Sequence, residues 1–178
     1  MRITSMLLLI AVVGIGGCEL LGDLTRVGTT YVVEFDLPAI QANSSFSVSR
    51  EVNFRAQLDS ILQANNFSES DLDNAQVDSV RFTILSPSGG TFDFVQSVSV
   101  WCASSSLGEQ QVLSAGTGSI PAGRNSVVLS ALPTADILAY IRGGNFTVRL
   151  EGRSSNTGTN TTYRVQAVLY TNIAFNVP

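Results

Sequence analysis

Apolar residues alternate with polar ones through most of this 178-residue chain, and that period of two restricts the possible folds more than any other feature. Tyr31, Val33, Phe35 and Leu37, for example, fall on one face of an extended strand over 30–37. Further strands are predicted over 46–54, 80–84, 92–102, 111–116, 125–131, 146–150 and 163–177. Strands that bury one face must pack against each other, so the pattern predicts an all-β fold.

Two stretches change to helical spacing. Leu and Ile residues three and four positions apart predict a short amphipathic helix over 55–65. Thr134 is expected to cap a second helix, which Gly143 and Gly144 end. About eight strands with two short helices favour an antiparallel β-sandwich in a single domain over 30–178, with a closed β-barrel as the alternative.

Two carboxy-terminal segments and one cysteine lead to further predictions. The segment 154–162 is rich in Ser, Thr, Asn and Gly, which predicts an exposed hairpin loop. The strand predicted over 163–177 is the longest, and at a sheet edge it could pair with a strand of another chain. Cys102 shares the parity of apolar neighbours, so it is expected in the core rather than in a reactive site.

The amino-terminal residues form a separate region. Arg2 precedes an apolar run over 6–15, and two glycines then lead directly to Cys18. This order of charged, apolar and small residues is typical of a secretory signal peptide. The apolar run is also much shorter than the roughly 20 residues that a membrane-spanning helix needs, so we expect no permanent transmembrane anchor there.

The residues Ile15, Gly16, Gly17 and Cys18 resemble the lipobox of bacterial lipoproteins. This resemblance covers the leader alone. It implies that residues 1–17 are removed, that the Cys18 thiol carries a diacylglyceryl group, and that fatty acyl chains anchor the protein to a membrane of the bacterial cell envelope. Residues 18–29 are then a lipidated tether, and the outer membrane is the favoured location.

Composition narrows the classes of function. The net charge is −4, only 13% of residues are charged, and all ten basic residues are Arg, so no basic patch for nucleic acid is expected. The chain has no His, which is the commonest general base and metal ligand. With no catalytic motif or cofactor motif recognised, we expect a non-enzymatic binding, adhesion or structural role, with envelope proteins or glycans as possible partners.

Acidic residues gather between the first helix and the following strand. Asp71, Asp73 and Asp78 follow Glu69 within ten positions, which is reminiscent of the oxygen-rich loops that bind calcium. Their spacing matches no defined calcium loop, however. A solvated connection, in which Asp71 or Asp73 caps a turn, is therefore the favoured interpretation.

Two aromatic residues have the outward parity of their strands. Trp101 is opposite in parity to the apolar face of 92–102, and Tyr170 is opposite to that of 163–177. Exposed aromatic rings can stack on sugars or contact proteins, although a covering loop or helix would give them a structural role. Trp101 and Tyr170 are thus candidates for a binding platform, and the alternative function is that of a carbohydrate-binding or glycan-processing accessory domain that uses Trp101 and nearby polar loops.

Overall fold

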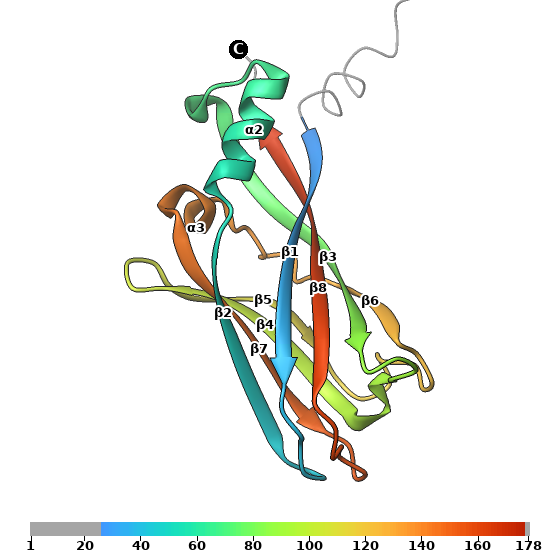
Figure 1. The fold of residues 1–178 in the computed structure, drawn as a ribbon. Coiled ribbons are helices and arrows are strands. Elements are labelled where there is room, and N and C mark those ends of the chain that lie inside the picture. Colours follow the sequence, from blue (N-terminus) through green and yellow to red (C-terminus); the bar gives the residue numbers. More distant parts are fainter. Residues whose placement is uncertain (1–25, 177–178) are drawn as a thin grey trace, which may run out of the picture.

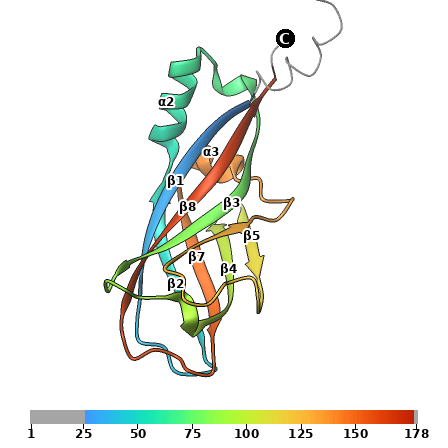
Figure 2. The ribbon, with the colours of Figure 1, turned by 90° about the vertical axis from the view of Figure 1, so that its right-hand side faces the viewer.

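The computed structural model describes residues 26–176, which form two four-stranded antiparallel sheets packed face to face (Figures 1 and 2). The strands are β1 (Arg26–Leu37), β2 (Ser45–Asn53), β3 (Leu72–Ser86), β4 (Val95–Ser104), β5 (Gly108–Ala115), β6 (Ser126–Ser130), β7 (Asn145–Ser154) and β8 (Tyr163–Phe175). The helices are α2 (Arg55–Asn65) and α3 (Leu138–Gly143), and the 3-10 turns are η1 (Glu69–Asp71) and η2 (Phe92–Phe94). The predicted β-sandwich is confirmed, and the described strands do not close into a barrel.

The two sheets have the strand orders β1-β8-β3-β6 and β2-β7-β4-β5. Strand pairing is nested along the chain, because β1 pairs with β8, β2 with β7, β3 with β6 and β4 with β5. Two Greek keys in a double sheet make this a jelly roll. Because the jelly roll supports lectins, capsid proteins and enzymes alike, the topology alone does not select a function.

Helix α2 lies at the end of the sandwich where β1 begins and β8 ends (Figure 1). Its apolar stripe is buried through Leu58 and Leu62, and Asn66 ends it in the left-handed conformation with a φ of 56°. The helix predicted over 55–65 is thus confirmed. The connections between β1 and β2 and between β7 and β8 lie at the opposite end (Figure 1).

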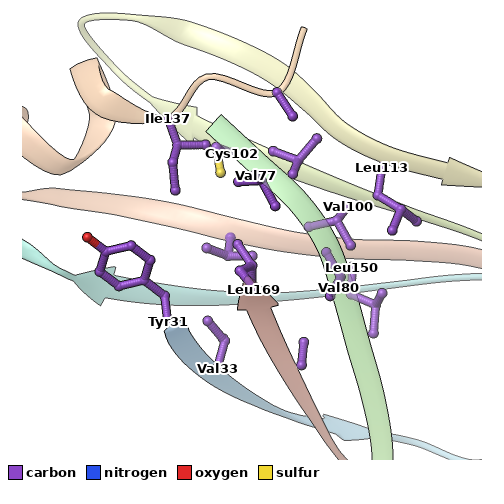
Figure 3. Packing of buried hydrophobic residues seen from close by; sticks show 14 of the residues in the cluster. Tyr31, Val33, Val77, Val80, Val100, Cys102, Leu113, Ile137, Leu150 and Leu169 are labelled. Atoms are coloured by element: carbon purple, nitrogen blue, oxygen red, sulfur yellow. The ribbon is translucent and has the colours of Figure 1, made fainter. Parts of the chain in front are cut away.

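The core fills the space between the sheets with inward-facing side chains from both (Figure 3). Tyr31 stacks on Phe54, with 4.4 Å between ring centroids. Cys102 is fully buried, as expected from its parity, and burial raises the pKa of its thiol to about 12. The thiol therefore stays protonated at neutral pH, which gives Cys102 a packing role.

Several predicted boundaries were wrong. Strand β1 begins at Arg26, so residues 26–29 belong to the sandwich and not to the tether expected over 18–29. The second helix begins at Leu138 because Ala135 and Ile137 first pair with β3 through backbone hydrogen bonds, and Thr134 does not cap it. Phe92 and Phe94 are buried as predicted but lie in the turn η2, before β4 begins.

The predicted roles of two carboxy-terminal segments were also wrong. The segment 154–162 connects β7 of one sheet to β8 of the other, so it is a crossover and not a hairpin. Its first residue, Ser154, is fully buried and donates a hydrogen bond to the carbonyl oxygen of Gln41 at 2.5 Å. Strand β8 pairs with β1 on one side and β3 on the other, so it offers no free edge to another chain.

Candidate binding surfaces

The predicted lipid attachment residue, Cys18, lies outside the described residues. Across residues 26–176, neither helix has the length and apolar character needed to cross a bilayer. The candidate surfaces that the structure does describe are the outer faces of the two sheets. Trp101 lies on one outer face and Tyr170 on the other, so the two aromatic residues cannot form a single platform.

Trp101 belongs to a compact cluster on the outer face of β2-β7-β4-β5. Arg149 is its register partner on β7, and the guanidinium carbon lies 5.5 Å from the centre of a Trp101 ring. Glu109 holds that guanidinium through contacts of 2.5 and 3.0 Å, and Glu151 lies 2.9 Å from its Nε. The hydrogen bonds from Arg149 hold the pKa of the Glu109 carboxyl below its ordinary value.

The cluster covers one face of the Trp101 ring. The Trp101 side chain is half-buried, and its Nε1 is covered with no hydrogen-bond partner among the described residues. A planar guanidinium held by two carboxylates lies over a Trp101 ring, so that face of the ring is not free to stack on a sugar. Trp101 is thus an outward residue that the protein itself covers.

A hollow of about 450 Å³ lies farther along the same face. It is lined mainly by short hydroxyl side chains of β2 and β4, together with Glu151 and Arg153 of β7. The one aromatic residue in its lining, Phe46, is buried in the core, and the ring of Trp101, two positions after Ser99 on β4, is already covered. This hollow therefore lacks an available stacking surface.

Tyr170 has a different environment, on the outer face of β1-β8-β3-β6. The guanidinium carbon of Arg81 lies 5.1 Å from the centre of the Tyr170 ring. Arg81 is exposed, and none of the ion pairs formed by the described residues includes it. An exposed arginine held by no carboxylate can move, so the cover on Tyr170 is removable.

A polar hollow of about 440 Å³ lies on that face, and its lining begins two residues along β8 from Tyr170. Asn172, two residues after Tyr170 on β8, lines it together with Asn74, Gln76 and Asp78 of β3. Arg26 of β1 and the segment 131–133 complete the wall. Three amides, one carboxylate and one guanidinium thus meet in one place, which offers both donors and acceptors of hydrogen bonds.

A β-bulge in β3 places Asp78 in this hollow. Val77 pairs with Thr171 and Ser79 with Tyr170, so Asp78 is an extra residue that no position on β8 opposes. Val77 and Val80 both remain buried, and the side chains between them face outward. Asp78 then accepts a hydrogen bond from the side-chain amide of Asn172.

The acidic residues considered for calcium do not converge. Asp71 accepts hydrogen bonds from the backbone N–H and hydroxyl of Ser68 at 2.8 and 2.6 Å, so it caps η1. Asp73 and Asp78 lie on β3, which the sequence interpretation treated as a connection. Between residues 26 and 176, no three His, Cys, Asp or Glu side chains come close enough together to hold a metal ion.

No protein-family model matches the sequence, and no curated protein matches it either. Among solved structures, a chain of Desmodium yellow mottle tymovirus is similar over 97% of this chain and 95% of the viral chain, with 12% sequence identity and a TM-score of 0.28. A TM-score this low supports no argument about fold or function.

Proposed function

We propose that this protein is a lipoprotein of the bacterial cell envelope, anchored to a membrane at Cys18, with a non-enzymatic binding, adhesion or structural role. The observation that carries the proposal is the lipobox-like sequence over 15–18 at the end of a signal-peptide pattern. One acyl chain would hold a protein only marginally, whereas two or three hold it stably, at about 0.8 kcal/mol per buried methylene.

The fold is compatible with such an anchor. Strand β1 begins at Arg26, eight residues after Cys18, and a fully extended chain of that length spans about 26–29 Å. The tether would therefore hold the sandwich close to the bilayer. The end that carries α2 would face the membrane, because β1 begins there (Figure 1).

Intact-mass analysis of the protein extracted from membranes tests this proposal. We expect a mature chain that begins at Cys18 and carries added lipid mass, and we expect the Cys18→Ala protein to lose both the lipid mass and the membrane association. An unmodified wild-type protein in the soluble fraction would contradict the proposal.

The second candidate function is that of a carbohydrate-binding accessory domain. One observation favours it, namely the polar hollow that adjoins Tyr170. The sequence interpretation placed this function at Trp101 and nearby polar loops, whereas the geometry favours the Tyr170 face. A screen against a glycan array tests this function, because a purely structural subunit should bind no sugar selectively.

A further inference from the structure

We infer that the hollow lined by Asn74, Gln76, Asp78 and Asn172, which we call the amide hollow, binds a neutral saccharide with Tyr170 at its border. The inference deepens the proposed binding role of the protein and rests on it. It stands on the shape of the hollow, on the hydrogen-bonding groups left available in it, and on its position beside Tyr170.

The shape comes from small residues as well as from the bulge. Ala174, the register partner of Asn74, lines the hollow, and Gly28 is the register partner of the lining residue Asn172, so two positions with little or no side chain lie at or beside it. A Cβ placed on Gly28 would lie 3.5 Å from Oδ1 of Asn172, which is an ordinary contact. The fold would thus tolerate a side chain at Gly28, and its absence leaves free space beside Asn172.

The hydrogen-bonding groups suit hydroxyl ligands. The Gln76 amide nitrogen donates to the carbonyl oxygens of Leu132 and Val77 at 3.3 Å, and the Asn172 amide nitrogen donates to Asp78. These bonds orient both amides, and within residues 26–176 the Oε1 of Gln76 and the Oδ1 of Asn172 receive no side-chain hydrogen bond. Sugar hydroxyls can donate to such oxygens and accept from the guanidinium of Arg26.

Charge and aromatic character further define the ligand. Arg26 and Asp78 carry opposite charges, so the amide hollow has no net charge and favours a neutral ligand. The volume of about 440 Å³ lies in the range of small-molecule sites, roughly 300–1,000 Å³. Tyr170 lies two residues before Asn172 on β8 and on the same face, so one sugar ring can occupy the amide hollow while the next contacts the phenol ring once Arg81 moves.

Two sources present this chemistry to a tethered protein. One is a soluble or cell-surface glycan, and the other is the sugar headgroup of a glycolipid in the same membrane. The amide hollow lies where β1 begins, at the end that the proposed tether would hold toward the bilayer. An array that carries both neutral oligosaccharides and glycolipid headgroups separates the two sources.

The test begins with the purified full-length mature protein on that array, in detergent if it is lipid-modified. Isothermal titration then measures its affinity for the neutral oligosaccharide with the strongest signal. We expect selective binding in at least one arm and a loss of about tenfold or more in Asn172→Ala, the effect of removing one or two hydrogen bonds. The matched control is Gln111→Ala, because Gln111 is also a half-buried amide but lies on the other outer face.

A second variant keeps the inference testable if Asn172→Ala folds poorly. Gly28→Leu adds a side chain over the amide hollow without removing any contact, so it should block binding while the thermal midpoint stays within a few degrees of wild type. Absence of selective saccharide binding in both arms would overturn the inference. Binding that both variants leave unchanged would overturn it as well. Because the array does not depend on lipid modification, its outcome is independent of the intact-mass test of Cys18.

Discussion

The two outer faces of the sandwich each carry one aromatic side chain beneath an arginine, yet the two arrangements differ. Arg149 covers Trp101 while Glu109 and Glu151 hold its guanidinium. Arg81 covers Tyr170, and no carboxylate within residues 26–176 forms an ion pair with it. An outward aromatic residue is therefore available for binding only where no ion-paired neighbour covers its ring.

The largest difference should appear when the aromatic rings are removed. We expect Trp101→Ala to lower the free energy of unfolding by about 2–3 kcal/mol, because a half-buried indole packed under Arg149 is lost. Tyr170→Ala should cost only about 1 kcal/mol, because its cover is mobile. Urea denaturation of both variants measures this difference. Equal costs would remove the proposed distinction between the faces.

The two arginines provide a smaller and more specific comparison. We expect Arg149→Ala to cost about 1 kcal/mol, chiefly from its contact with the indole and from the packing of its stem. Arg81→Ala should stay within about 0.5 kcal/mol of wild type. Trp101 is the one tryptophan of the chain, so its fluorescence reports this face alone. Acrylamide should quench it more efficiently in Arg149→Ala, whereas an unchanged quenching constant would show that Arg149 does not cover the ring.

The smallest expected effect is a pH dependence of the Trp101 environment. Arg149 lowers the pKa of Glu109 below its ordinary value of 4.5, so the pairing is fully present above pH 4.5. It is lost as the pH falls through the lowered pKa in the folded state. Trp101 emission in the folded protein should change in that acidic window, and Glu109→Gln should abolish the change. A transition that persists in Glu109→Gln would assign the titration to another group.

Much of the sandwich could be predicted because most strands keep a strict period of two. The runs of β1 and β7, for example, each place large apolar residues at alternate positions, and the structure buries them. Arg50 interrupts the apolar run of β2, and it lies on an edge strand, where it pairs with Asp36 of β1 at 2.5 Å. Local periodicity, however, contains no information about which strands pair, so the nested order of the jelly roll could not be derived.

The candidate site was missed for a related physical reason. A bulge adds one residue, so the apolar residues in the first half of β3 have the opposite parity from Val80. Because the alternation is broken there, the sequence predicts a solvated connection instead of a strand. The amides of Asn74 and Gln76 on either side of Ala75 were a usable signal for an exposed polar face. The covers on Trp101 and Tyr170 depend on cross-strand register, which a single sequence does not specify.

A nuclear magnetic resonance titration with the selected neutral oligosaccharide tests the difference between the two faces most directly, because it observes both in one sample. We expect added sugar to shift the ring signals of Tyr170 and the side-chain amide signals of Asn172, Gln76 and Asn74. The indole N–H signal of Trp101, on the opposite outer face, should stay in place. Shifts at the Trp101 indole with none at the amide hollow would show that the sugar binds the Trp101 face instead.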